Sequence, residues 1–174
     1  AYADIEIPLA QGQSMLAPKV VGRMLQALRV GADDRTLEIG TGTGYVTACL
    51  ARLSTRVISL EIDPTLAKAA RTNLGDAAPS HLELREADGL AGPVEGGPFD
   101  VIAVTGSLPD DQLLPALQAQ LAPGGRLFVV IGGEPVMEAT LITRQASDAF
   151  LRRGLFETAL PPLENIPESE QFVF

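Results

Sequence analysis

The sequence predicts an α/β protein: a doubly wound, mostly parallel sheet of seven strands with helices on both faces and an antiparallel C-terminal hairpin. Three observations lead to this prediction. Short apolar runs alternate with stretches whose apolar residues recur at helical spacing. Each run is continuously apolar, as in a parallel sheet covered on both faces. No repeat, low-complexity tract or linker divides the 174 residues, so we expect one domain over residues 1–174.

The first half of the chain alternates helix and strand. An amphipathic helix over 18–28 is followed by a buried strand over 36–39 and a helix over 45–53. A second strand over 56–62 is rich in Val and Ile. Pro64 then opens the next helix, because its fixed φ suits the first helical turn.

The second half continues the alternation and then changes to strands alone. A helix is expected after Asp110 or Asp111, either of which can cap it, and Pro123-Gly124-Gly125 ends it. The remaining strands are expected over 82–86, 100–105 and 126–131, with an antiparallel hairpin of strands over 138–144 and 155–160.

The charge balance excludes several classes of protein. Thirteen Lys and Arg against 22 Asp and Glu give a formal net charge of −9. Nonspecific nucleic-acid binding and attachment to anionic membranes both need a basic face, so neither nucleic acid nor membrane is an expected partner. One cysteine, Cys49, and one histidine, His81, leave no thiolate cluster, and no metal is expected.

No apolar run is long enough to span a bilayer, and the N-terminus has no basic segment followed by an apolar one. These features favour a cytoplasmic protein. A monomer is favoured, with the oligomeric state left open.

A glycine-rich loop follows the first predicted strand and reads Glu-Ile-Gly-Thr-Gly-Thr-Gly-Tyr over 38–45. The dinucleotide fingerprint is G-x-G-x-x-G, but here the third glycine comes one residue early. The pattern E-x-G-x-G-x-G favours S-adenosylmethionine over NAD; the alternative is only a tight strand–helix turn. The candidate cofactor-binding residues of the loop are Glu38, Gly40, Thr41, Gly42, Gly44 and Tyr45.

Further candidates come directly after the next three strands, whose carboxyl ends share one edge of the sheet. Glu61 lies about 20 residues past the loop's first glycine, the spacing at which a carboxylate accepts ribose hydroxyls, and Ile62 can press on adenine. Asp88 can accept the adenine amino group, with Gly89 leaving room for the ring. Thr105 would flank the methionine portion. Each has a simpler alternative. Glu61 could be a solvated carboxylate, Asp88 could form an Asx turn, and Thr105 could satisfy local backbone groups.

Several segments together resemble the protein-L-isoaspartate O-methyltransferases, in order over nearly the whole chain. The most specific is the N-terminal run with Tyr2, Asp4, Pro8, Gly12-Gln13 and Ala17-Pro18. The others are 37–45, Asp88-Gly89, Pro98-Phe99-Asp100 and 121–127.

The resemblance implies a function. That family transfers a methyl group from S-adenosylmethionine to the carboxylate of an isoaspartyl residue, and the ester collapses to a succinimide that reopens partly to normal aspartate. It implies a protein or peptide substrate carrying isoaspartate. It also implies a substrate-side segment over 1–30, a cofactor-binding core over 31–174, and a chain truncated at its N-terminus, because members carry a helical segment ahead of this region.

The chain departs from the family at the substrate site. The family usually reads Gln-Thr-Ile-Ser-Ala-Pro-His, and here residues 13–19 read Gln-Ser-Met-Leu-Ala-Pro-Lys. The family's active-site hydroxyl therefore falls on Leu16. Ser14 retains a hydroxyl two residues upstream, and Lys19 retains a donor that could hold a substrate carboxylate. Ser14 and Lys19 are the candidate catalytic residues.

Three other readings stay open at this point. A diverged methyltransferase could act on another peptide or on a small-molecule acid. A non-catalytic S-adenosylmethionine-binding module would fit intact cofactor residues beside a lost hydroxyl at Leu16. An NAD-dependent dehydrogenase fits least, because Tyr45 stands where the third fingerprint glycine belongs.

Overall fold

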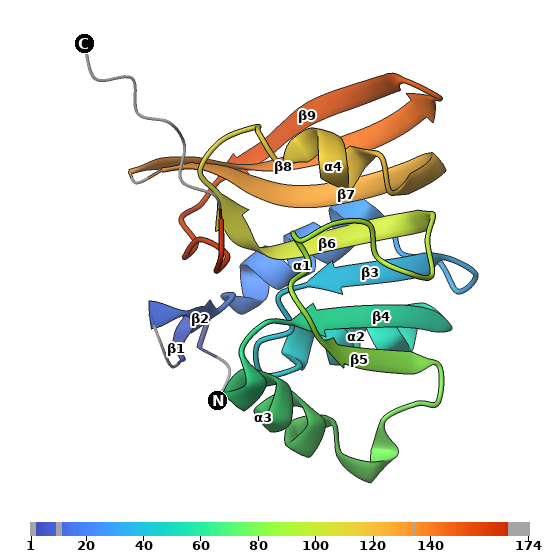
Figure 1. The fold of residues 1–174 in the computed structure, drawn as a ribbon. Coiled ribbons are helices and arrows are strands. Elements are labelled where there is room, and N and C mark those ends of the chain that lie inside the picture. Colours follow the sequence, from blue (N-terminus) through green and yellow to red (C-terminus); the bar gives the residue numbers. More distant parts are fainter. Residues whose placement is uncertain (1–2, 10–11, 134, 167–174) are drawn as a thin grey trace.

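The computed structural model describes residues 3–9, 12–133 and 135–166. One sheet forms the body of the protein (Figure 1). Its seven strands are β3 (Arg35–Ile39), β4 (Arg56–Glu61), β5 (Leu82–Glu86), β6 (Phe99–Leu108), β7 (Leu121–Gly133), β8 (Val136–Ala146) and β9 (Ala149–Glu157). Their order is β5-β4-β3-β6-β7-β8-β9. The first five strands pair in parallel, and β8 and β9 pair antiparallel, which confirms the predicted sheet.

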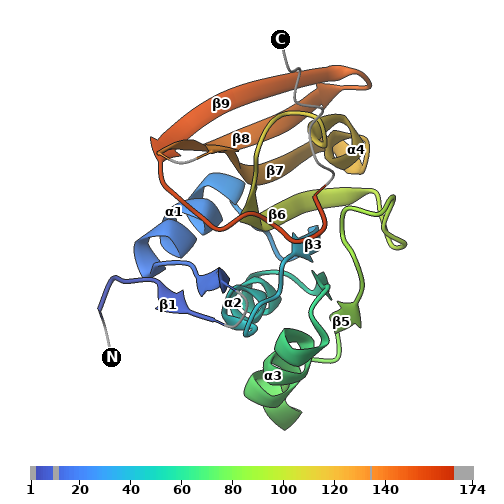
Figure 2. The ribbon, with the colours of Figure 1, turned by 60° about the vertical axis from the view of Figure 1, so that its left-hand side comes forward.

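Helices cover both faces of this sheet (Figure 2). α1 (Pro18–Leu28) and α2 (Tyr45–Leu53) pack on one face, where they share an apolar cluster with β6, β7 and β8. α3 (Pro64–Leu74) packs beside the start of α2. α4 (Leu114–Gln118) covers the opposite face. A short 3-10 turn, Gly75–Ala77, follows α3.

Local chemistry explains where the predicted helices begin. α1 and α3 both start with a proline at the first turn. The Asp63 carboxylate accepts hydrogen bonds from the backbone N–H groups of Thr65 (2.6 Å) and Leu66 (3.1 Å), so it caps α3.

The last strand and the fourth helix differ from the predictions. β9 spans Ala149–Glu157 rather than 155–160. It lies at the sheet edge and exposes most of its residues, so the chain there lacks the apolar run that marks a covered strand.

The helix expected after Asp110 or Asp111 has only five residues, and neither aspartate caps it. Asp110 accepts from the Gln112 N–H (2.9 Å), and Asp111 pairs with Arg152 (2.6 Å). The helix stops early because Leu121 already pairs with Phe99 in the sheet.

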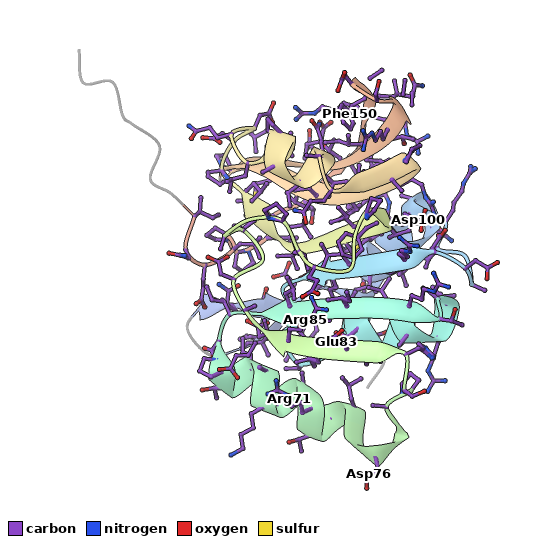
Figure 3. All side chains as sticks on the ribbon, turned by 45° about the vertical axis from the view of Figure 1, so that its right-hand side comes forward. Arg71, Asp76, Glu83, Arg85, Asp100 and Phe150 are labelled. Atoms are coloured by element: carbon purple, nitrogen blue, oxygen red, sulfur yellow. The ribbon has the colours of Figure 1, made fainter. Side chains whose placement is uncertain are left out.

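The opposite edge strand, β5, carries charge along its free side. Glu83 and Arg85 form an ion pair (2.8 Å) on this strand, and Arg71 of α3 lies near Glu86 (3.8 Å). Figure 3 shows Arg71, Glu83 and Arg85 around this edge. Charged side chains of this kind keep an edge strand from pairing with another chain.

Two segments meet at the carboxyl ends of the parallel strands, on the left of Figure 1. One is a small hairpin of β1 (Ile7–Pro8) and β2 (Ser14–Met15), which the sequence did not predict. The other is the segment after β9, residues 158–166, which pairs with β6 through a bridge between Ser107 and Pro162. Together they flank the edge where the candidate site residues lie.

Candidate functional site

A pocket opens at the carboxyl edge of the sheet and holds about 590 Å³, counting the part open to solvent. Its walls come from the hairpin, the glycine loop, the ends of β3 to β6 and the segment after β9. The lining residues are Leu9, Gln13, Ser14, Ile39, Gly40, Gly42, Leu60, Glu61, Ile62, Leu66, Ala87, Asp88, Gly89, Leu90, Thr105, Gly106, Leu163 and Glu164.

The glycine loop brings backbone close to this pocket. Gly40 adopts a φ of +94°, and a Cβ on it would lie 2.5 Å from Thr105 Oγ1. Only glycine fits such a position without strain or collision. The Thr105 hydroxyl donates to the carbonyls of Ile39 (2.9 Å) and Gly40. Thr105 therefore lines the pocket while its hydroxyl fixes the backbone of the loop.

Glu61 stands at the end of β4 and is almost fully buried. Its carboxylate accepts from the Gly42 N–H (2.7 Å) and the Asp63 N–H (3.0 Å). An ionised carboxylate has about four lone-pair directions, so roughly two remain for a ligand. Ile62, next in the chain, lines the same pocket.

Asp88 follows β5 and is held on both oxygens. Oδ1 accepts from the Leu90 N–H (2.8 Å), and Oδ2 accepts from the Asn165 amide (2.7 Å). Glycine is needed at position 89 for packing as well as for ligand space, because a Cβ there would lie 2.6 Å from Ile39 Cγ2. The Asx turn and the pocket position thus occur together at Asp88.

Glu38 differs from its expected place at the ligand. It is fully buried, does not line the pocket, and its Oε2 accepts from Thr47 (2.5 Å) and Ser59 (2.6 Å). Its Oε1 has no hydrogen-bond partner among the described residues. Burial raises the pKa of Glu38 to about 7, and the nearby Glu61 charge acts in the same direction. Ser59 also contacts Thr41 (2.6 Å), so this carboxylate supports the glycine loop from beneath.

The other residues of the loop face elsewhere. Gly44 forms the start of α2 at a φ of +89° and packs against Ala70 and Leu74, so its role is in helix packing. Thr41 and Tyr45 line a second, smaller hollow of about 340 Å³ that adjoins the first.

The two candidate catalytic residues differ in their relation to this second hollow. Ser14 lines both hollows, and Leu16, which is buried in the apolar cluster under α1, lines the second. The Ser14 hydroxyl donates to the Glu6 carboxylate (3.1 Å). Lys19 lines neither hollow: its ammonium group pairs with Asp4 (3.3 Å) and its side chain is 69% exposed. The structure therefore brings Ser14 to the site and leaves Lys19 outside it.

Sequence reasoning missed three residues that line the pocket. Leu163 and Glu164 belong to a segment without regular structure, so no periodicity marks them. Gln13 lines the pocket and donates to the Pro162 carbonyl (3.2 Å). Ser107, which follows a predicted strand, binds backbone groups of the segment after β9 instead of lining the pocket.

The sheet order, with its antiparallel last strands, is that of the Rossmann-like methyltransferase fold. A solved structure from Plasmodium falciparum, described as a protein-L-isoaspartate O-methyltransferase in complex with S-adenosyl-L-homocysteine, matches with a TM-score of 0.82 and 22% identity. The match covers 94% of this chain and 81% of that one. A methyltransferase from Thiobacillus denitrificans matches with a TM-score of 0.58 and 18% identity, over 74% of this chain and 51% of that one.

The chain belongs to the protein-L-isoaspartate(D-aspartate) O-methyltransferase family, whose model matches residues 1–165. The protein-L-isoaspartate O-methyltransferase of Anaeromyxobacter dehalogenans strain 2CP-C is 42% identical over 169 residues, covering 96% of this chain and 80% of the relative. The protein of the same name from Koribacter versatilis is 37% identical over 163 residues, covering 94% and 72%. The resemblance predicted from the sequence is thereby confirmed.

Two other kinds of site are absent from the described residues. Among the residues that the structure describes, no helix has both the length and the apolarity needed to cross a membrane. Within the same ranges, no group of three or more His, Cys, Asp or Glu is arranged to hold a metal ion.

Proposed function

We propose that the protein transfers the methyl group of S-adenosylmethionine to the side-chain carboxylate of isoaspartyl residues in damaged proteins. One observation carries the proposal: the Glu61 and Asp88 carboxylates and the glycine-loop backbone converge on one pocket, and Ser14 stands where that pocket meets a second hollow. Family membership supports the same reaction.

The pocket residues fit S-adenosylmethionine. Gly40 and Gly42 line the pocket with backbone that carries no Cβ, and both adopt a positive φ. Glu61 and Asp88 both line the pocket and can each accept further hydrogen bonds, as ribose hydroxyls and an adenine amino group would require. We propose these two roles, with Ile62 against the adenine face.

The reaction requires little acid–base chemistry from the protein. When bound, the cofactor supplies an electrophilic methyl group on a sulfonium. A carboxylate with a pKa of about 4 is already ionised at pH 7, so it needs no general base. The position of the single histidine agrees with this view. His81 lies beside the Ala51 carbonyl (3.0 Å), near the amino ends of the parallel strands and away from the pocket. The protein's contribution is therefore orientation and exclusion of water.

Ser14 is the proposed orienting group for the acceptor. Its hydroxyl can turn from Glu6 towards a substrate carboxylate, because both side chains lie at the surface. Leu16 offers no hydrogen bond and closes the bottom of the second hollow with apolar surface. This difference supports a second candidate: methyl transfer to another peptide or small-molecule carboxylate.

A cytoplasmic site of action and a protein or peptide partner are part of the proposal. Isoaspartate arises in polypeptides, so the acceptor must reach the pocket as an exposed, locally unfolded segment. The open carboxyl edge of the sheet allows such a segment to approach past Ser14.

The test combines binding and turnover in one preparation. Titration calorimetry with S-adenosylhomocysteine measures the cofactor site. Transfer of a labelled methyl group is then compared between an isoaspartyl peptide and its normal aspartyl twin. Binding with transfer to the isoaspartyl peptide alone is expected. Binding with transfer to neither peptide would reject the isoaspartyl acceptor, and absence of binding would reject the cofactor assignment.

A further inference from the structure

The segment after β9, residues 158–166, is fixed to β6 at Ser107. The Ser107 N–H donates to the Pro161 carbonyl (2.9 Å), and the Leu163 N–H donates to the Ser107 carbonyl (3.0 Å). The buried Ser107 hydroxyl donates to the Leu160 carbonyl (2.9 Å). All three polar groups of one buried residue therefore hold this segment in place.

Beyond Ser107 the segment crosses the cofactor pocket. Leu163 packs over two glycines, since a Cβ on Gly40 or Gly106 would lie 3.4 Å or 2.7 Å from its Cδ2. Two residues later, Asn165 adopts a φ of +59°, which asparagine tolerates better than most residues. This turn aims its amide at Asp88, with Nδ2 2.7 Å from Oδ2.

The carboxylate of Asp88 is thus fixed from two sides. The Leu90 N–H holds Oδ1, and the Asn165 amide holds Oδ2. A carboxylate with one donor on each oxygen cannot rotate freely about its last side-chain bond. Each oxygen still has a lone pair for a further donor. Of the two donors, only Asn165 uses its side chain, so a substitution of Asn165 removes one hydrogen bond to Asp88 and leaves the other.

We propose that Asn165 is a positioning residue that holds the Asp88 carboxylate ready for the amino group of adenine. The inference rests on the proposed function and adds a source of base specificity to it. A carboxylate held in this orientation accepts from a 6-amino group and repels a 6-oxo group. A carboxylate free to turn away discriminates less well between the two.

The experiment measures this discrimination by calorimetry, without turnover. The two ligands are S-adenosylhomocysteine and S-inosylhomocysteine, in which a carbonyl oxygen replaces the 6-amino group. In Asn165→Ala, affinity for the adenosyl compound is expected to fall about fivefold, the loss of one modest hydrogen bond. Affinity for the inosyl compound is expected to stay the same or improve. The ratio of the two affinities, which measures the preference for adenine, therefore falls. Gln26→Ala, an exposed amide on α1, is the matched control and keeps the wild-type preference.

A double-mutant cycle separates positioning from simple support of the segment. Asp88→Asn removes the preference by itself, and adding Asn165→Ala is then expected to change it no further. Parallel losses for both ligands in Asn165→Ala would overturn the proposal, because they indicate a displaced segment. Unchanged affinities would overturn it as well. A wild-type protein that binds neither ligand would reject the proposed function itself, whereas normal binding with an unaltered Asn165→Ala preference rejects only this inference.

Discussion

At the scale of single residues, burial decides what the charged groups of the site do. Glu38 lies within β3 and Glu61 ends β4, both near the glycine loop, and both are buried. Glu61 reaches the pocket and accepts from backbone N–H groups. Glu38 points beneath α2 and accepts from hydroxyls, with one oxygen unpartnered among the described residues. One carboxylate thus lines the pocket, and the other supports the glycine loop.

Substitution of Glu38 is expected to change how stability depends on pH. The pKa of Glu38 is raised by burial from 4.5 in the unfolded chain to about 7 in the folded protein. The folded state therefore holds this proton more tightly, and the free energy of unfolding declines as pH rises from about 4.5 to 7. Glu38→Gln is expected to remove a decline on the order of 2 kcal/mol between pH 5 and pH 8.

Urea unfolding at several values of pH measures this slope. Glu83→Gln is the control, because the hydrogen bond from Arg85 lowers the pKa of that exposed carboxyl and its titration falls below the window. If Glu38→Gln and the wild type decline in parallel from pH 5 to pH 8, the assignment to Glu38 is wrong.

Substitutions of Ser14 and Lys19 are expected to have different effects on the methyl-transfer rate. Ser14→Ala removes the hydroxyl between the two hollows and should lower the transfer rate roughly tenfold, while S-adenosylhomocysteine affinity stays within about threefold. Lys19→Ala should change neither quantity, since its ammonium group pairs with Asp4 at the surface. Steady-state transfer assays and calorimetry measure both variants. A large loss of transfer rate in Lys19→Ala would contradict this prediction and indicate that Lys19 acts on the acceptor.

At the scale of elements, most of the regular structure follows from local sequence. Helices α1 and α3 begin at prolines, and the Asp63 side chain caps α3. Strand pairing in the sheet overrode the local pattern in two places. α4 ends early because Leu121 enters the sheet opposite Phe99, and β9 begins at Ala149 because β8 supplies its partner.

The glycine at the middle of α1 provides a prediction about helix stability. Gly22 is exposed, and a Cβ there would meet no atom within 4 Å. Gly22→Ala should therefore raise the free energy of unfolding by about 0.5 to 1 kcal/mol through helix propensity. Gly124→Ala, which also has open space but a φ of +77°, should lower it by about 1 kcal/mol. Urea denaturation measures the free energy of unfolding of both variants. Equal changes in the two would contradict the explanation from backbone conformation.

At the scale of the whole molecule, the N-terminal segment and the sheet form one packed body. The apolar cluster on the α1 face runs from Leu16 through α1 and α2 to β8. Arg126 of β7 reinforces this union: its guanidinium group donates to the carbonyls of Leu28 (2.8 Å) and Arg29 (3.0 Å) and pairs with Asp34 (2.6 Å). We propose that residues 1–30 and the core unfold together.

Replacing this arginine tests the cooperative unit. A lysine cannot make the forked contacts, so Arg126→Lys should lower the free energy of unfolding by about 1 to 3 kcal/mol. The transition should stay single when followed by both circular dichroism and tyrosine fluorescence. Arg152→Lys, whose exposed pair with Asp111 contributes little, is the control. Two separated transitions in Arg126→Lys would show that the N-terminal segment unfolds by itself.

The sequence alone determined the sheet, most of its helices and the positions of the site along the chain. Apolar periodicity and the glycine loop are local features, and parallel strands place their carboxyl ends at one edge whatever the details of packing. Glu61, Asp88 and Ser14 could therefore be located from their positions relative to strands and motifs.

Only the tertiary structure decided which of these side chains enter the pocket. Glu38 and Lys19 were equally good candidates in the sequence, but burial under α2 and pairing with Asp4 direct them elsewhere. The pocket wall formed by Leu163 and the Asn165 contact to Asp88 join residues far apart in the chain. No local pattern encodes such contacts, because they arise when Ser107 binds a segment that returns across the finished sheet.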